Sequence, residues 1–154
     1  MEQMETAKKF YVQAQKMTIG MAASVVAYGA IGYYLIHLGK GGPAILNTSN
    51  YPIVKYGALV FAILGVFAMW KISNRIFNAP QGAPLASNRP VQKIFLKTVI
   101  MNAGAELPLL LGMLLVFFGH QPYDYIPFAI VSLSGFFLAY PRKEQWVSWL
   151  GAEF

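Results

Sequence analysis

The chain has 154 residues, of which 56% are hydrophobic and 12% are charged, whereas soluble domains average about 45–50% apolar and about 25% charged residues. This composition excludes a single soluble core, and the formal net charge of +6 is spread between apolar runs instead of clustering as in a nucleic-acid-binding surface. Cysteine is absent, which excludes disulfides, thiolate metal sites and cysteine nucleophiles.

The first half of the chain contains two apolar stretches long enough to cross a membrane. Residues 17–39 carry no formal charge and exceed the roughly 20 residues that a spanning helix needs. Lysines precede this stretch as in a signal peptide, but it is longer than the usual apolar region of about 7–15 residues, so we expect it to be retained. A second span is predicted over residues 53–72, with Lys55 and Lys71 at its two ends.

The second half contains two more apolar stretches after a long connection. Residues 73–92 contain several prolines and a glycine and are predicted as a loop that separates two hairpins. A third span is predicted over residues 97–119 and a fourth over residues 124–141, the fourth being close to the minimum length. We therefore expect residues 1–154 to form one all-α integral membrane domain of four transmembrane helices in two hairpins.

The positive residues indicate how the spans are oriented. Ten of the twelve Lys and Arg residues fall on one side of the predicted topology, and only Lys40 and Lys55 fall on the other. The positive-inside rule assigns the richer side to the cytoplasm. We therefore expect both termini and the loop to be cytoplasmic, in a bacterial inner membrane. The ten residues are Lys8, Lys9, Lys16, Lys71, Arg75, Arg89, Lys93, Lys97, Arg142 and Lys143.

Both ends of the chain carry an apolar stripe at helical spacing. A helix with one apolar and one charged face commonly lies in the membrane interface, so we expect a short interfacial helix at each end. The alternative is that these stripes bind a partner protein. The stripes are Met4, Ala7, Tyr11 and Ala14 near the start, and Trp146, Trp149, Leu150 and Phe154 near the end.

Glu106 is the residue most indicative of chemistry, because it lies near the middle of the third span. An ionised carboxylate in hydrocarbon is costly, so the sequence predicts a neutral acid that can bind and release a proton. Asn102 lies one turn earlier on the same helical face and can offer its amide to the acid. Pro108 cannot donate to the Gly104 carbonyl, which predicts a kink and a free carbonyl beside the acid. The alternative role for Glu106 is a protonated acid that only ties helices together.

The sequence around Glu106 resembles a known family. Residues 105–116, AELPLLLGMLLV, are similar to the carboxylate-bearing helix of rotary ATP synthase subunit c, and residues 88–92, NRPVQ, are similar to the cytoplasmic loop of that family. The resemblance covers the loop and the third span. It implies a helical hairpin in which Glu106 is the proton-binding carboxylate.

Few other residues suggest chemistry. His37 and His120 end the first and third spans on the same predicted side and, with Asp124, are the candidate ligands for a metal or a haem. Histidines at a membrane interface commonly hydrogen-bond water or headgroups, so we expect no metal and no cofactor. Motifs for nucleotide binding, nucleophilic catalysis or metalloprotease chemistry are absent, so a self-contained enzyme is not expected.

Two hypotheses about function follow from these residues. The first is a small integral membrane subunit that handles protons or ions through Glu106 and Asn102, as the subunit c resemblance implies. The second is a non-catalytic accessory or assembly subunit of a larger inner-membrane complex, and haem binding is a third alternative. The expected partners are the lipid bilayer and either other membrane subunits or further copies of the chain. No nucleic acid is expected.

Overall fold

The computed structural model describes residues 2–38, 49–76, 89–119 and 121–150. Of these residues 94% are helical and none belongs to a strand, which confirms the predicted all-α class. The elements in chain order are α1 (Glu2–His37), α2 (Tyr51–Ile76), α3 (Arg89–Gly119), a short 3-10 helix η1 (Pro122–Asp124), α4 (Tyr125–Ala139) and α5 (Lys143–Leu150).

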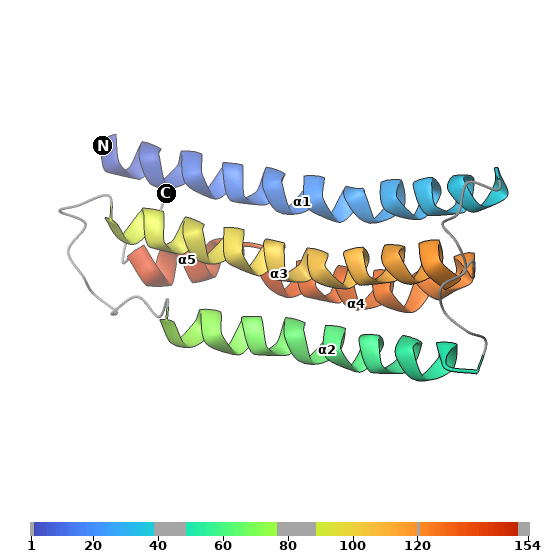
Figure 1. Ribbon diagram of the computed structural model, residues 1–154. Helices are drawn as coiled ribbons and strands as arrows, with labels where there is room; N and C mark the ends of the chain where they lie inside the picture. Colours follow the sequence, from blue (N-terminus) through green and yellow to red (C-terminus); the bar gives the residue numbers. More distant parts are fainter. Residues whose placement is uncertain (1, 39–48, 77–88, 120, 151–154) are drawn as a thin grey trace.

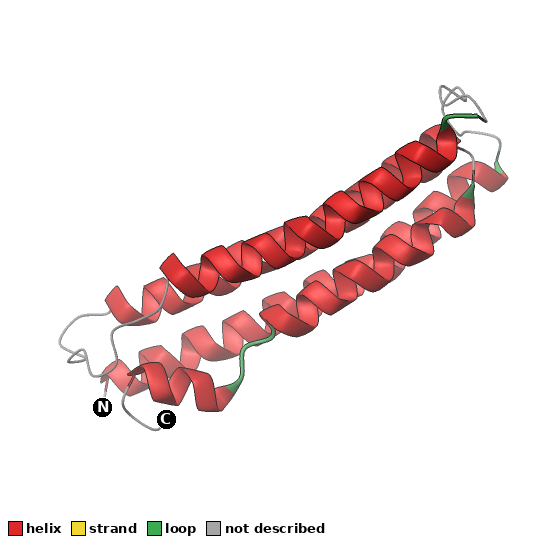
Figure 2. Cartoon of the chain, turned by 90° about the horizontal axis from the view of Figure 1, so that it is seen from below, coloured by secondary structure: helices red, strands yellow, loops and turns green. Residues whose placement is uncertain are grey.

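The long helices form a bundle around α3. Figure 1 shows α3 between α1 and α2, with α4 alongside it, and Figure 2 shows all of these helices running along one common direction. Helices α1 and α3 run one way and α2 and α4 run the other, so that α1 begins and α5 ends at the same end of the bundle. Because α3 contacts the three other long elements, its residues decide what lies in the middle of the protein.

Three small apolar clusters fill the bundle along its length. The first lies at the end where α1 begins, and it joins α1, α3 and α5. The second joins α1, α3 and α4 near the middle, and the third joins α2, α3 and α4 towards the other end. Their buried members are Ala7, Ala14, Val91, Ile94 and Trp146 in the first, Val25, Ala105, Leu109 and Phe136 in the second, and Ala62, Leu115 and Phe128 in the third.

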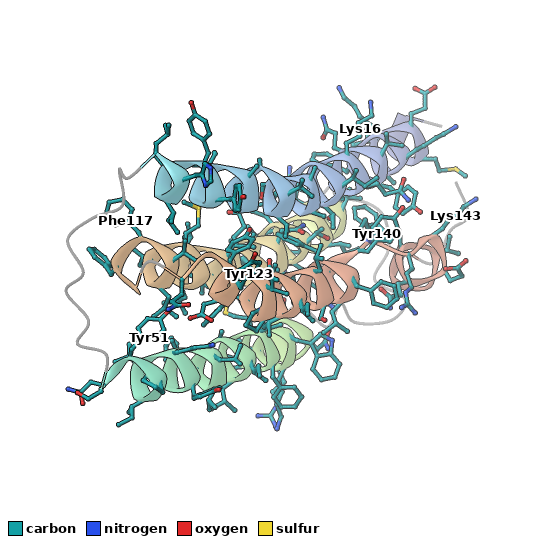
Figure 3. The ribbon with its side chains drawn as sticks, turned by 90° about the vertical axis from the view of Figure 1, so that its right-hand side faces the viewer. Lys16, Tyr51, Phe117, Tyr123, Tyr140 and Lys143 are labelled. Atoms are coloured by element: carbon teal, nitrogen blue, oxygen red, sulfur yellow. The ribbon has the colours of Figure 1, made fainter. Side chains whose placement is uncertain are left out.

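Among the described residues, three helices are long and apolar enough to cross a membrane: Met4–His37, Tyr51–Arg75 and Val91–Gly119. Many large apolar side chains on their outward faces are exposed, for example Val26 at 76% and Phe61 at 69%. Such exposure suits lipid contact and not water. In Figure 3, Lys16 and Lys143 lie towards one end of the bundle and Tyr51 towards the other. These findings support an integral membrane protein. Helix α4 has 15 residues and is a shorter apolar helix.

The predicted interfacial helix at the start of the chain is wrong. Helix α1 is continuous from Glu2 to His37, with no Gly or Pro before Gly20 to interrupt it. Ala7 and Ala14 of the predicted stripe are 2% and 0% exposed, because they pack in the cluster that includes Val91 of α3. These two residues of the stripe therefore face the protein and not the membrane surface, while Met4 at its start is 45% exposed.

The end of the chain also differs from the prediction. A short helix, α5, forms there, but Trp146 is only 1% exposed and its ring meets the ring of Tyr11 edge to face, with 5.6 Å between centroids. This tryptophan therefore anchors α5 to α1 instead of lying in the interface. The side chains of Trp149, Leu150 and Phe154 lie outside the described residues.

The predicted loop over residues 73–92 is too long at both ends. Helix α2 continues to Ile76, and α3 already begins at Arg89. Pro90 falls in the first turn of α3, where its missing N–H has no helical partner to lose, so the proline starts the helix instead of breaking it. Residues 77–88 lie outside the described residues.

Candidate functional site

The structure places the predicted acid halfway along α3. Glu106 follows Val91 by about 22 Å and precedes Gly119 by about 20 Å along the axis, at 1.5 Å for each residue. Both distances are more than half of the roughly 30 Å of hydrocarbon in a bilayer. If α3 crosses the membrane, Glu106 therefore lies far from water at either end.

Asn102 belongs to a directed set of hydrogen bonds between α3 and α1. Its Nδ2 donates to the Thr98 carbonyl and to Thr18 Oγ1, both at 2.9 Å. The Thr18 hydroxyl donates in turn to the Ala14 carbonyl at 3.0 Å, so its oxygen acts as the acceptor for Asn102. Since the two partners of Nδ2 are acceptors, the orientation of the Asn102 amide is fixed.

The same arrangement leaves one buried acceptor without a donor. Asn102 is 0% exposed, and its Oδ1 has no hydrogen-bond partner among the described residues. A buried polar atom in this state costs about 1–3 kcal/mol. The sequence predicts only that Asn102 can offer its amide to Glu106; because Nδ2 is bonded elsewhere, the part of the amide that remains for the acid is the acceptor Oδ1.

Glu106 lies at the edge of the protein and not in its centre. Its side chain is half-buried, and the described residues provide no hydrogen bond or ion pair to its carboxyl group. Of its neighbours three or four positions away, Ala103 and Leu110 are exposed, whereas Asn102 and Leu109 are buried. The acid can therefore be reached from outside the bundle.

Proline and small residues shape α3 next to the acid. Pro108 lies inside α3, where the sequence places it, its side chain is buried, and the helix continues past it to Gly119. Ser132 Oγ of α4 donates to the Ala105 carbonyl at 2.6 Å, so a side chain from the neighbouring helix binds the backbone one residue before Glu106. Gly104 lies against α2, where an added Cβ would meet the Met69 Cγ atom at 3.1 Å.

The candidate metal and haem ligands are not brought together among the described residues. His37 is exposed and stacks on Tyr33, with 5.7 Å between ring centroids. Asp124 accepts hydrogen bonds from Lys55 Nζ at 2.6 Å and from the Tyr51 hydroxyl at 2.5 Å, so it ties η1 to the start of α2. In the described part of the chain no group of three His, Cys, Asp or Glu side chains could hold a metal, and His120 lies outside that part.

Sequence reasoning missed two partners in this site. Thr18 and Ser132 supply the contacts between helices around Asn102 and Ala105, and both are polar residues within predicted spans. Their place inside apolar spans could have identified them, because a hydroxyl in such a span usually bonds either its own backbone or another helix. The pairing itself depends on the register between helices, which a single sequence does not provide.

Comparison of the chain with protein-family models, with curated proteins and with solved structures found no match.

Proposed function

We propose that this protein is a small integral membrane subunit in which Glu106 binds and releases a proton on the outward side of α3. The observation that carries this proposal is that two polar groups without hydrogen-bond partners lie about one helical turn apart. Glu106 has no partner in the described residues, and the buried Asn102 Oδ1 lacks a donor. Side chains four residues apart on a helix are neighbours, so the two groups are within reach of each other after a change of rotamer.

The protonation state of Glu106 decides whether this pair can form. A protonated carboxyl group has an O–H that can donate to Asn102 Oδ1, whereas an ionised carboxylate has only acceptors and repels that oxygen. Proton binding would therefore satisfy the buried amide, and proton release would free it again. The site thus differs in hydrogen bonding between its two states, as a proton-handling group requires.

The resemblance to the subunit c hairpin supports the same chemistry, but the packing of α2 limits how far it extends. An added Cβ on Gly57 or Gly65 of α2 would meet no described atom within 4 Å, so these glycines make no close helix contact within the chain. The exposed Phe61 and Phe67 are bulky residues on that helix. We therefore propose proton exchange with a neighbouring chain, and not assembly into the tightly packed ring of a rotor.

The proposal includes the finer topology. Helix α4 is about 22 Å long, short of the hydrocarbon thickness, but its outward face is largely apolar, and the exposed Ser134 hydroxyl on that face donates to the Ile130 carbonyl of the same helix. Ile126, Ile130, Leu133 and Phe137 recur at helical spacing and are 46–70% exposed. We propose that α4 is a fourth crossing, in a locally thinned bilayer. The charge distribution then makes both termini cytoplasmic in a bacterial inner membrane.

A carbodiimide experiment tests the role of Glu106. The purified full chain in lipid is treated with dicyclohexylcarbodiimide, an apolar reagent that modifies protonated carboxyl groups, and the adducts are located by mass spectrometry. We expect an adduct on Glu106 whose rate of formation falls as the pH rises. Asp124, which is paired with Lys55, serves as the internal control and should react less. Absence of a Glu106 adduct at every pH would refute the proposal.

Two substitutions separate proton handling from a structural role. Glu106→Gln keeps a donor for Asn102 Oδ1 and should leave stability nearly unchanged, while it removes the titrating group. Glu106→Leu removes both. If Gln destabilises the protein as much as Leu does, the acid acts through its charge in the fold and the proposal fails.

A second candidate function is that of an accessory subunit, and one observation favours it. Gly20, Ala23 and Ala27 on the outward face of α1 are exposed, and small residues at such spacing allow close approach of another helix. Purification in mild detergent tests this candidate. A stable complex with other membrane subunits that is unaffected by Glu106→Gln would favour the accessory role over proton handling.

A further inference from the structure

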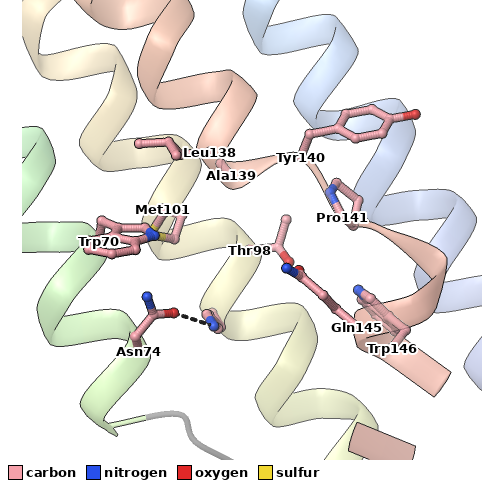
Figure 4. A pocket seen from close by; sticks show the side chains of 11 residues that line it. Trp70, Asn74, Thr98, Met101, Leu138, Ala139, Tyr140, Pro141, Gln145 and Trp146 are labelled. Atoms are coloured by element: carbon pink, nitrogen blue, oxygen red, sulfur yellow. Dashed lines mark hydrogen bonds between the residues drawn. The ribbon is translucent and has the colours of Figure 1, made fainter. Parts of the chain in front are cut away.

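A partly open cavity lies at the end of the bundle where α2 ends and α3 begins. Its volume is about 180 Å³, and its wall comes from α2, α3, the end of α4 and α5 (Figure 4). This volume is several times the ~30 Å³ occupied by one water in the liquid. The lining residues are Trp70, Asn74, Lys97, Thr98, Met101, Leu138, Ala139, Tyr140, Pro141, Gln145 and Trp146.

One side of the cavity is suited to an anion. Lys97 Nζ donates to Asn74 Oδ1 at 2.8 Å, and this bond is drawn in Figure 4. An ammonium group carries three donors, so Lys97 can bind Asn74 and an anionic oxygen at the same time. The Asn74 and Gln145 side-chain amides add further donors in the wall. Of the lining residues that the structure describes, Lys97 is the one cation and none is a carboxylate.

The charged residues around the cavity also favour binding of an anion. Exposed basic side chains surround this end of the bundle, and the acidic side chains described there are Glu5 and Glu144. The summed field of such a cluster attracts anions and raises their local concentration. The basic residues are Lys8, Lys9, Lys16, Lys71, Arg75, Lys93, Arg142 and Lys143.

The other side of the cavity is apolar and faces the outside of the bundle. Trp70 and Leu138 line it and are 36% and 49% exposed, so the wall continues into the outer surface that contacts lipid. Lys97 is the last charged residue of α3 before Glu106, which places its ammonium at the boundary between the polar and the apolar part of the helix. Lysines and tryptophans at such boundaries lie at the level of the lipid headgroups.

We propose that this cavity binds the phosphate group of an anionic phospholipid. Lys97, Asn74 and Gln145 hold the phosphate oxygens, and the acyl chains run from the cavity across Trp70 and Leu138 along the outside of the bundle. Lys97 is about 13–14 Å from Glu106 along α3, at nine residues and 1.5 Å each, and the lipid site does not depend on the proton-handling role. A free phosphate shares the headgroup chemistry but leaves the apolar wall unused.

Lipid retention by the purified full chain tests the proposal. Native mass spectrometry counts the molecules of phosphatidylglycerol and phosphatidylcholine that stay bound at equal concentration. We expect preferential retention of phosphatidylglycerol and about five-fold weaker binding in Lys97→Gln, the effect of one lysine beside an anionic lipid. Lys93→Gln, which removes an exposed lysine one turn earlier on α3 that contributes only to the surrounding field, is the matched control and should weaken lipid binding less than Lys97→Gln does. Equal binding by wild type and Lys97→Gln would overturn the proposal.

A second measurement uses the wild-type protein and does not depend on a variant. Phosphatidylglycerol with brominated acyl chains, present as a minor component of a phosphatidylcholine bilayer, should quench tryptophan fluorescence more than brominated phosphatidylcholine at the same fraction. Addition of inorganic phosphate should not relieve this quenching. If inorganic phosphate displaces the lipid, the ligand is a soluble phosphate and the lipid assignment is wrong. Equal quenching by the two lipids would also overturn it.

Discussion

Replacement of Gly135 by alanine should destabilise the bundle at the contact between α3 and α4. A Cβ at this position would lie 2.8 Å from Ala105 Cβ and 3.2 Å from Ala105 Cα, and the second of these atoms is backbone. Val66 Cγ1 of α2 would be 3.3 Å away. Neither helix can move aside cheaply, because Ser132 of α4 also hydrogen-bonds the Ala105 carbonyl in the same contact.

Two opposing terms set the size of the effect. Alanine is more favourable than glycine in a helix by about 0.5–1 kcal/mol, which stabilises the variant. Overpacking of a closely packed contact costs about 1–3 kcal/mol. The net expectation for Gly135→Ala is a loss of about 1–2 kcal/mol in the free energy of unfolding. Gly65, where an added Cβ meets nothing within 4 Å, should show only the favourable term.

Denaturation of the purified protein by SDS in mixed micelles, followed by circular dichroism, measures both variants. Gly65→Ala is the control and should be slightly more stable than wild type, so the two substitutions should differ in sign. Gly135→Ala combined with Ala105→Gly moves one methyl group across the contact and should recover most of the overpacking cost. If Gly135→Ala is as stable as Gly65→Ala, the close approach of α3 and α4 at this point is wrong.

Three further predictions follow from the ends of the bundle. Trp146→Ala should lower the free energy of unfolding by about 3 kcal/mol in the same assay, because the ring is buried against α1 and not placed in the interface. Asp124→Asn should cost about 1 kcal/mol in the free energy of unfolding, and much less in a background that already carries Lys55→Met, as a double-mutant cycle would show. A cysteine at Ser49 should react with an impermeant thiol reagent added outside intact cells, and a cysteine at Arg75 should not; the opposite pattern would refute the proposed orientation.

The class of the fold could be predicted from composition and the lengths of the apolar runs. The bounds of the helices could not be predicted in this way, because they depend on packing against residues that are distant in the sequence. Residues 2–16 look like an amphipathic interfacial helix, yet the apolar residues Ala7 and Ala14 pack on Val91 and Ile94 of α3. Composition distinguishes an apolar face from a polar one, but it does not tell whether protein or lipid covers that face.

In the candidate site too, some features could be predicted from the local sequence, and others depend on contacts between helices. The depth of Glu106 and the break in hydrogen bonding at Pro108 follow from local sequence, since both depend on residues within one or two helical turns. The role of Asn102 does not follow, because its amide is directed towards Thr18 on another helix. The sequence indicated that an amide lies beside the acid, but the contact with α1 decides that its oxygen, and not its hydrogens, is left for Glu106.

The position of Glu106 around α3 bears on the choice between proton handling and structural support. An acid that only holds helices together belongs in the seam, where Asn102 and Ser132 are fully buried and bonded across helices. Four residues advance an α-helix by one turn and about 40° more, which takes Glu106 from the seam at Asn102 towards the exposed side that carries Leu110. Within a single turn α3 thus presents a buried amide that fixes the packing and a half-buried acid at the edge of the bundle, open to the outside. Exchange of a proton with another subunit needs such access, whereas a hydrogen bond within the bundle would not leave the acid at the edge.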